Sequence, residues 1–368
     1  MIETIKRMDL VLLLCLLSLA GLGLMTLYAA VHQGGIGLWQ RQVIYWFLGL
    51  GLLFSMCFIP LRLVGLFTWP VYMAALIALA LVPLFGDVQM GARRWLNLWL
   101  IHFQPSEMMK WVLMLVLAYW FASRTANSLK DLCWAAALTA APVGLIVLQP
   151  DLGTALVLVL DAAIMIFAAG LPWRWAVSGV AAGLISLPFL WHNMHTYQRQ
   201  RVLSFLDPQS DPLGAGYHVI QSAIAIGSGG MFGKGYLHGT QARLHFLPEQ
   251  HTDFIFAVLA EEGGLLVSAL LLVLYAVMLL RILTIANRAH TRFGGLTCIG
   301  VAVVFTLYIC INIGMVAGVL PVVGVPLPFI SYGGSALITM LAALGLVMRI
   351  GIESRGQVRW QRPGSPLA

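Results

Sequence analysis

Long apolar segments separated by short polar breaks run along almost the whole chain. A membrane-spanning helix needs roughly 20 predominantly apolar residues, so each such segment predicts one span. We expect ten spans, at residues 10–31, 42–59, 66–85, 106–123, 132–149, 152–170, 174–191, 253–280, 296–318 and 333–350. The pattern predicts an all-α integral membrane protein, a polytopic bundle of about ten transmembrane helices with a large outer loop between the seventh and the eighth.

The composition agrees with a membrane protein. Hydrophobic residues make up 60% of the chain and charged residues 10%, whereas an ordinary soluble domain has about 25% charged residues. So few charges cannot cover a water-exposed surface, which excludes a soluble enzyme, a nucleic-acid-binding protein and a disordered scaffold. The five cysteines lie in or beside apolar segments without a C-x-x-C pair, so they indicate neither a disulfide framework nor a thiolate metal site.

The distribution of Lys and Arg orients the spans, because cytoplasmic segments of membrane proteins are enriched in these residues. The net charge of +7 is interpreted in this way rather than as a sign of nucleic-acid binding. With a cytoplasmic N-terminus, most of the 21 basic residues fall on the cytoplasmic side. An even number of spans returns the C-terminus there as a tail of about 351–368. The outer loop is then about 192–252, and the whole chain, 1–368, forms a single transmembrane domain.

The basic residues that fall outside the membrane oppose this topology and therefore need another role. They are Arg41, Arg93, Arg94, Arg199, Arg201, Lys234 and Arg243. Arg93 and Arg94 precede Trp95, a combination that also suits an interfacial anchor. The glycines at 227–235 around Lys234 would let backbone amides approach a phosphate, although flexible glycine-rich turns often bind nothing.

One basic residue, Lys110, lies inside a predicted span. Glu107 precedes it by three residues, so the two side chains share one face of the helix and can pair. Ser106 suits a helix N-cap, and Glu107 then lies in the first turn, where a carboxylate is favourable. Because ionisable groups within the membrane are costly, they indicate function by default. We favour a functional role for Lys110 over a purely structural ion pair.

Several polar residues lie at the outer start of the eighth span. Thr252 as a helix cap and Asp253 in the first turn would explain them structurally. A carboxylate at the membrane edge, beside His251 and among unexplained cations, equally indicates chemistry. Glu261 and Glu262 lie deeper in the same span, and two adjacent carboxylates cannot both face lipid. From these residues alone, the structural and the functional interpretation of Asp253 are equally well supported.

A proline-rich segment at 321–328 separates the last two spans. Three prolines within eight residues cannot continue a helix, so the segment predicts an ordered apolar loop that dips toward the outer membrane surface. We interpret this loop mainly as structural. It can also form one wall of a cavity that is open to lipid.

Together these segments resemble the SEDS family (shape, elongation, division and sporulation), and most closely its elongation branch. The resemblance covers about residues 8–352 and rests on long, ordered motifs. The motifs are Q-P-S-E with Lys110 after it, Q-P-D-L-G-T at 149–154, Y-Q-R-Q-R-V at 197–202, D-P-L-G-A-G-Y-H at 211–218, A-I-G-S-G-G at 225–230, G-K-G at 233–235, F-L-P-E-Q-H-T-D-F at 246–254, A-E-E at 260–262 and G-V-P-L-P-F-I-S-Y-G-G-S at 324–335.

The resemblance implies a peptidoglycan glycosyltransferase, which polymerises lipid II into β-1,4 glycan strands during cell elongation and releases undecaprenyl diphosphate. It implies that the chain works with a class B penicillin-binding protein and other membrane proteins of an elongation complex, and with no nucleic acid. The implied location is the bacterial inner (plasma) membrane, with both termini cytoplasmic and the active site facing the periplasm.

The resemblance also assigns roles to residues. Asp253 falls at the position of the family's essential carboxylate, and we predict that it is the catalytic base. A lipid-linked diphosphate is already a good leaving group, so one base that deprotonates the acceptor 4-hydroxyl suffices. No ligand cluster demands a metal, although Mg²⁺ or Mn²⁺ between Asp253 and the diphosphate is compatible with the sequence. Substrate contacts are predicted for Glu107, Lys110, Arg94, Arg199, Arg201, Lys234, Glu249 and His251.

Two other functions account for part of the pattern. A transporter that flips lipid II across the membrane would also need about ten spans and buried charges. It does not need a carboxylate at the outer edge or a large outer loop. A scaffold that recruits the penicillin-binding protein is compatible with the resemblance but incomplete. We therefore expect the glycosyltransferase.

Overall fold

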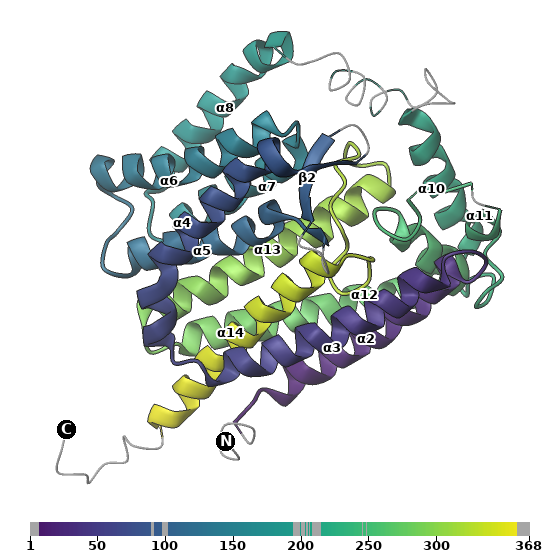
Figure 1. Ribbon diagram of the computed structural model, residues 1–368, viewed down its shortest axis with the longest axis horizontal. Helices are drawn as coiled ribbons and strands as arrows, with labels where there is room; N and C mark the ends of the chain where they lie inside the picture. The colour runs from purple at the N-terminus through teal and green to yellow at the C-terminus, as the bar shows by residue number, and fades with distance from the viewer. Residues whose placement is uncertain are drawn as a thin grey trace.

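The computed structural model is almost entirely helical (Figure 1). It describes residues 7–89, 92–97, 102–193, 199, 203, 205, 207, 215–244, 246–247 and 249–358. The helices are α2 (Leu10–Val31), α3 (Ile36–Phe58), α4 (Leu61–Phe85), α5 (Pro105–Ala122), α6 (Leu129–Leu148), α7 (Leu152–Ala168), α8 (Trp173–Asn193), α10 (Ala215–Gly229), α11 (Thr240–Arg243), α12 (Ile255–Arg288), α13 (Arg292–Val316) and α14 (Gly334–Val358). Three short strands lie between α4 and α5: β1 (Asp87–Gln89), β2 (Ala92–Asn97) and β3 (His102–Phe103).

The prediction of an all-α, polytopic membrane bundle is confirmed. Each predicted span coincides with one long helix. Among the described helices, 7 are long and apolar enough to cross a membrane, namely α2, α3, α4, α6, α12, α13 and α14. Helix α7 is shorter, with 17 residues, and the first turns of α5 carry Glu107 and Lys110. Helix α8 lies at the edge of the bundle, and most of its described side chains are exposed.

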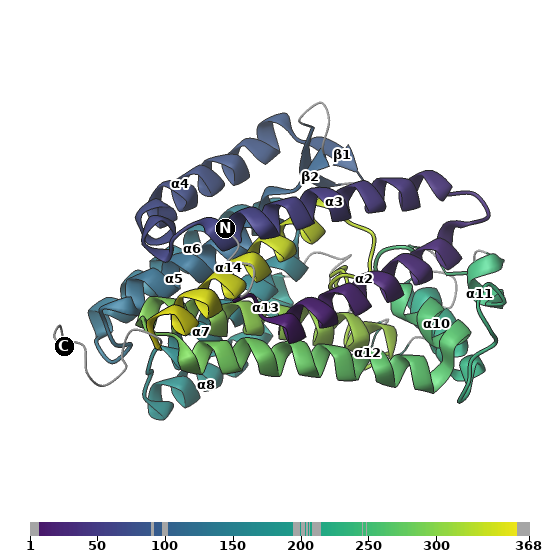
Figure 2. The ribbon, with the colours of Figure 1, turned by 90° about the horizontal axis from the view of Figure 1, so that it is seen from below.

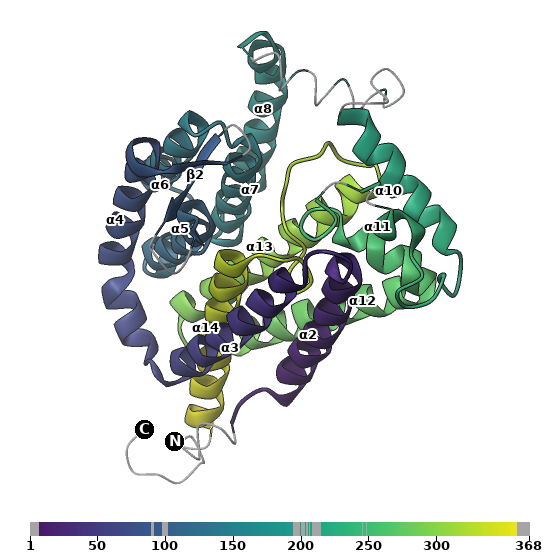
Figure 3. The same ribbon diagram turned by 45° about the vertical axis from the view of Figure 1, so that its right-hand side comes forward.

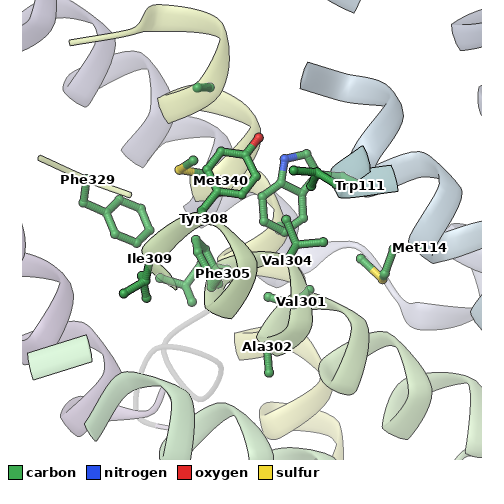
Figure 4. Packing of buried hydrophobic residues seen from close by; sticks show 14 of the residues in the cluster. Trp111, Met114, Val301, Ala302, Val304, Phe305, Tyr308, Ile309, Phe329 and Met340 are labelled. Atoms are coloured by element: carbon green, nitrogen blue, oxygen red, sulfur yellow. The ribbon is translucent and has the colours of Figure 1, made fainter. Parts of the chain in front are cut away.

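Helix α13 lies at the centre of the bundle. It packs against α5 and α7 and against α12 and α14, as Figure 2 shows from below. A helix that is apolar all round is normally buried on every side, and most of the apolar side chains of α13 are buried. Midway along it, the ring centroid of Phe305 lies 5.3 Å from that of Trp111 and 5.4 Å from that of Phe329 (Figure 4). These contacts bring α5 and the loop before α14 together beside one helix.

The strands between α4 and α5 form an antiparallel sheet in the order β1-β2-β3, which the apolar pattern did not predict. Asp87 pairs with Trp95, and Leu96 pairs with Phe103. Strands of two to six residues are too short for their alternation to stand out from a loop in the sequence. Arg94 therefore lies on a strand, β2, that packs on α4 and α5.

Helix α12 is interrupted at Gly264, where φ is 66° and ψ is −164°. The segment after α10 covers this interruption, and the amide of Leu265 donates to the carbonyl of Gly230 at 2.9 Å. A Cβ on Gly264 would collide with the amide nitrogen of Gly233, so the positive φ and the close approach both require glycine. Irregular backbone at membrane depth is tolerated only where protein or water satisfies it. Here the outer loop supplies the partners.

The segments predicted as the outer loop and the cytoplasmic tail are partly helical in the structure. The outer loop of about 192–252 contains helices α10 and α11, and α10 packs along α12. The cytoplasmic tail, predicted at about 351–368, overlaps α14, which continues to Val358. Polar contacts hold these last turns: Arg349 lies 2.8 Å from Glu353, and Arg355 lies 2.6 Å from Asp9. The second pair joins segments that lie far apart in the chain, and the hydropathy pattern did not show it.

The two ends of the described chain meet at one end of the bundle. Arg355 of α14 donates to the main-chain carbonyls of Arg7 and Met8, at 3.1 and 3.2 Å. At the opposite end, where α2 finishes, the side-chain amide of Gln250 donates to the carbonyl of Ala30 at 2.8 Å. Figure 3 shows α10 and α11 at this second end, far from both termini. The segment around Asp253 therefore lies across the bundle from the chain ends.

Asp9 joins three helices where the chain ends meet. Its carboxylate caps α2 by accepting from the amide of Leu12 at 3.1 Å. It also accepts from Arg281 of α12 at 2.9 Å and from Arg355 of α14 at 2.6 Å. Burial alone would raise the pKa of Asp9, but the hydrogen bonds from Arg281 and Leu12, together with the two positive charges, bring the pKa below its usual value.

We expect Asp9→Asn to destabilise the protein at neutral pH and to matter little in acid. Because its folded pKa is depressed, ionised Asp9 stabilises the fold fully above the unfolded pKa of about 3.9, and this contribution is lost as the pH falls through the folded value. Hydrogen bonds to a charged group contribute about 1.5–3 kcal/mol each. Melting curves in detergent should show a lower melting temperature for Asp9→Asn at neutral pH and a difference that shrinks below about pH 4. A difference that is constant with pH would contradict this role.

Candidate functional site

Asp253 lies in a tight turn directly before α12. The sequence suggested Thr252 as the helix cap and Asp253 in the first turn, but the N-cap is Phe254. The Thr252 hydroxyl instead donates to the Glu249 carboxylate at 3.1 Å. Glu249 has a φ of 51°, a left-handed conformation that is uncommon outside glycine and is often found at functional sites. Asp253 therefore lies just outside α12 and is half-buried.

The loop between α13 and α14, residues 317–333, packs directly on this turn. The Ser331 hydroxyl donates to the carbonyl of Thr252 at 2.7 Å. A Cβ on Gly324 would lie 3.3 Å from Oδ2 of Asp253. Gly324 also has a φ of 78°, which a larger residue adopts only with strain. Glycine therefore suits this position, because it adopts the positive φ and leaves room beside the carboxylate.

The ion pair that the spacing predicted on α5 is present and buried. Lys110 Nζ lies 2.6 Å from Glu107 Oε1, and 1% of Lys110 is exposed. The hydroxyl of Tyr308 on α13 donates to the other Glu107 oxygen at 2.7 Å, and Lys110 Nζ lies 4.5 Å from the centre of the Tyr308 ring. Gln104, and not Ser106, is the N-cap of α5. Glu107 still lies in the first turn, where the helix dipole favours a carboxylate.

Helix α13 connects this ion pair to the turn of Asp253. Asn312 follows Tyr308 by four residues, so the two side chains lie on the same face of α13. The side-chain amide of Asn312 donates to the main-chain carbonyl of Asp253 at 3.0 Å. Four residues correspond to about 6 Å along a helix. The buried Lys110–Glu107 pair therefore lies about one helical turn deeper in the bundle than Asp253.

Arg94 contacts the turn between α6 and α7. Its guanidinium donates to the carbonyl of Pro150 at 2.6 Å and lies 3.9 Å from Asp151, which is the N-cap of α7. Gly153, in the first turn of that helix, is in direct contact with Val323. Val323 precedes Gly324, on which a Cβ would lie 3.3 Å from Oδ2 of Asp253. Arg94 is thus connected to the site through the loop before α14.

Lys234 forms an ion pair inside the protein. Its Nζ lies 2.7 Å from Glu261 Oε1 on α12 and donates to the Thr240 hydroxyl at 2.8 Å. Glu261 also accepts from the amides of Thr240 and Gln241, at 2.8 and 3.1 Å, and so caps α11. The amides of Lys234 and Gly235 each donate to an α12 carbonyl at 3.0 Å. The glycine-rich segment therefore attaches the outer loop to α12, and these two amides are not available to a phosphate.

Substrate contacts were predicted for Arg199 and Arg201, which both follow α8 in the chain. Arg199 donates to the carbonyls of Trp191 and His192, at 3.1 and 2.6 Å. These carbonyls belong to the last turn of α8, so Arg199 acts as a C-terminal cap for that helix. Arg201 lies outside the described residues.

His251 lies two residues before Asp253, in the same turn. Its Nε2 lies 3.9 Å from Glu249 Oε2, and its ring centroid lies 6.0 Å from that of Tyr332. Burial lowers the pKa of His251, and the Glu249 carboxylate opposes that shift only in part. The lowered pKa favours the neutral imidazole, which can donate one hydrogen bond and accept another.

Three polar residues of this site were not singled out from the sequence: Gln42, Tyr308 and Asn312. Tyr308 and Asn312 lie inside an apolar segment, which is the signal that would have identified them, and Gln42 lies at the start of one. The Gln42 side chain donates to the carbonyl of Ser331 at 3.1 Å and accepts from the amide of Gly333 at 3.2 Å. All three residues therefore hold segments that surround Asp253 or Lys110.

Peptidoglycan glycosyltransferases are similar to this chain in sequence. The chain is 47% identical to the peptidoglycan glycosyltransferase MrdB of Escherichia coli strain K12 over 349 residues, which are 94% of this chain and 93% of that protein. It is 37% identical to the probable peptidoglycan glycosyltransferase FtsW of Coxiella burnetii over 359 residues, with 93% and 95% of the two chains covered.

Solved structures are also similar to this one. A chain of a peptidoglycan synthase complex that coordinates polymerization and crosslinking matches with a TM-score of 0.83 and 38% identity, over 96% of this chain and 99% of that one. The rod shape determining protein RodA of Thermus thermophilus matches with a TM-score of 0.72 and 32% identity, over 96% and 98%. Residues 5–356 match the family described as Cell cycle protein, which comprises FtsW, RodA and SpoVE. This match extends over nearly the whole chain, and the protein therefore belongs to the FtsW, RodA and SpoVE family, the SEDS family.

Proposed function

We propose that this chain, a peptidoglycan glycosyltransferase, polymerises lipid II into β-1,4 glycan strands with Asp253 as its general base. The observation that carries the proposal is a half-buried carboxylate at the end of the bundle, about one turn above the buried cation of Lys110. The names of the relatives, peptidoglycan glycosyltransferases, support polymerisation over the flipping of lipid II.

The reaction needs one proton acceptor. The acceptor 4-hydroxyl attacks C1 of the donor sugar, the bond from C1 to the diphosphate breaks, and undecaprenyl diphosphate departs. A diphosphate leaves as a stable anion, so no acid comparable to that of the glycosidases is required. Asp253 accepts the hydroxyl proton as the new bond forms. Attack opposite the leaving group converts an α-linked donor into a β-1,4 linkage.

The departing diphosphate concentrates negative charge, which a positioned cation stabilises. Lys110 is the best placed candidate, because Glu107 and Tyr308 hold its ammonium about one turn below Asp253. Lys110, Lys234 and Arg199 all have protein partners, so the substrate would have to replace a partner or bind beside the pair. These contacts stay predictions, as do those of Glu107, Arg94, Arg201, Glu249 and His251.

A divalent cation at this site would take oxygen ligands. In the described part of the chain, no group of three His, Cys, Asp or Glu residues lies together in a way that could hold a metal ion. Mg²⁺ or Mn²⁺ beside Asp253 would therefore take most of its ligands from the diphosphate.

The chain crosses the membrane several times, and its orientation is part of the proposal. We assign the Asp253 end to the periplasmic face of the inner membrane and both termini to the cytoplasm. Arg7, Arg281 and Arg355 lie together at the end where the chain termini meet, and cytoplasmic segments are enriched in such residues. Lipid II then reaches Asp253 from the outer leaflet.

Polymerisation in a purified system tests the proposal. The chain is reconstituted in proteoliposomes with fluorescent lipid II, and products are separated by size before and after digestion with a muramidase. Glycan strands that the muramidase degrades are the expected result. Transfer of lipid II across the bilayer without polymer would contradict the proposal and support a transporter.

We expect a class B penicillin-binding protein to bind the chain and to raise its polymerisation rate. The similar synthase complex couples polymerization with crosslinking, and the outer loop of this chain exposes large apolar side chains, Met231 at 56%, Phe232 at 79% and Leu244 at 61%. Exposed apolar groups of this kind are typical of protein or membrane contacts. Initial rates are measured with and without the partner at equal chain concentration. Equal rates would contradict the expectation.

A further inference from the structure

The three consecutive main-chain carbonyls that lead into α12 are each bound by a donor from another segment. The carbonyl of His251 accepts from the amide of Tyr332 at 2.9 Å, that of Thr252 from the hydroxyl of Ser331 at 2.7 Å, and that of Asp253 from the side-chain amide of Asn312 at 3.0 Å. We call these three donors the carbonyl clamp. The backbone that carries Asp253 is therefore held at three successive residues.

The side chain of Asn312 connects the turn of Asp253 to the loop between α13 and α14. Its side chain is 0% exposed, and its amide donates a second hydrogen bond to the carbonyl of Val325 at 2.7 Å. Val325 follows Gly324, whose Cβ position lies 3.3 Å from Oδ2 of Asp253. One buried amide therefore binds both the main chain of Asp253 and the main chain next to Gly324.

The segment that carries the other two donors is itself fixed by neighbouring helices. The hydroxyl of Ser331 accepts from the amide of Leu327 at 2.8 Å while it donates to the turn. Gln42 of α3 donates to the carbonyl of Ser331 at 3.1 Å, and Tyr275 of α12 donates to the carbonyl of Pro328 at 2.6 Å. The clamp is thus supported by two helices rather than by a free loop.

From this geometry we infer that Asn312 and Ser331 are positioning residues for Asp253. They act on its backbone, and through the backbone they set the direction of its carboxylate. A general base must lie within hydrogen-bond reach of the proton that it removes, and a misplacement of about 1 Å can lower a rate by about 100-fold. The inference rests on the proposed function, because it concerns the aim of Asp253 as the base.

Asn312→Leu tests the clamp, since leucine has a similar size and no donor. The expected result is a fall in kcat by about 10-fold to 100-fold, with KM for lipid II changed much less. Ser331→Ala removes a different bond and should lower kcat in the same way but by a smaller factor. Ser354→Ala is the matched control, because it removes a buried hydroxyl bonded to the carbonyl of Ile350 at the opposite end of the bundle.

The pH dependence separates a positioning role from a general loss of structure. The acid limb of the polymerisation rate reports the protonation of the base. If the Asp253 carboxylate is displaced, the apparent pKa of the acid limb changes in Asn312→Leu and Ser331→Ala. It does not change in Ser354→Ala. If Asn312→Leu does not fold, Ser331→Ala alone decides. Wild-type kcat and an unmoved acid limb in the folded clamp variants, or a fall equal to that of Ser354→Ala, would overturn the inference.

The outcome for Asp253 itself keeps the two proposals distinct. If Asp253→Asn polymerises at the wild-type rate, the base assignment is wrong and the clamp positions nothing catalytic. If Asp253→Asn is inactive while Asn312→Leu and Ser331→Ala keep their kcat and their acid limb, only the positioning inference fails.

Discussion

Replacement of Asp253 by Asn is expected to abolish polymer synthesis and to leave the fold intact. Asparagine is nearly isosteric with aspartate but cannot accept the proton of the acceptor hydroxyl. General-base catalysis contributes about 10²-fold to 10⁴-fold to a rate, so the polymerisation rate should fall at least about 100-fold. The turn should persist, because Asn312 binds the main-chain carbonyl of Asp253 and not its carboxylate.

The measurement combines activity with melting temperature. Polymer formed from lipid II is followed over time for the wild type, Asp253→Asn and the control Asp131→Asn. Asp131 forms a 3.6 Å ion pair with Arg124 in the first turn of α6, and we assign it no role in chemistry. All three proteins should have similar melting temperatures. Glycan synthesis by Asp253→Asn at near the wild-type rate would refute the base assignment.

The second large effect concerns the buried pair of Glu107 and Lys110. Lys110→Met leaves the Glu107 carboxylate buried without its cation, and breaking a buried pair in this way costs about 3–5 kcal/mol. Lys110→Met with Glu107→Gln removes both charges, and the glutamine oxygen can still accept from Tyr308. The double variant should therefore recover much of the lost stability. It should not recover polymerisation if Lys110 stabilises the diphosphate.

Melting temperature, lipid II binding and polymerisation are measured for Lys110→Met, for the double variant and for Lys110→Arg. The arginine variant keeps the charge but replaces a compact ammonium by a planar guanidinium, so it should recover only part of the activity. A double variant that is stable, binds lipid II and polymerises normally would make the pair purely structural. A stable double variant that has lost both binding and polymerisation supports the contact with the diphosphate.

Part of the site could be predicted because its signals are local. Lys110 stands three residues from Glu107, and on a helix this spacing alone brings the two side chains together. Asp253 stood out as a carboxylate at the edge of an apolar span, although its role came from the family motif around it. Lys234 was noticed for the same reason, as a charge that topology did not explain. Its partner Glu261 is 27 residues away, and no spacing rule connects the two.

The sequence by itself determined the membrane-spanning helices, because the length and apolarity that a bilayer requires are properties of each segment alone. Contacts between segments were decided only by the tertiary structure. The break of α12 at Gly264 depends on the loop around Gly230, which precedes it by 34 residues (264 − 230), and the sheet before α5 depends on pairing between very short strands. The same holds for the clamp on Asp253, since Asn312 is 59 residues away. Hydropathy marks which residues leave water, but a buried hydrogen bond exists only where packing brings its donor to its acceptor.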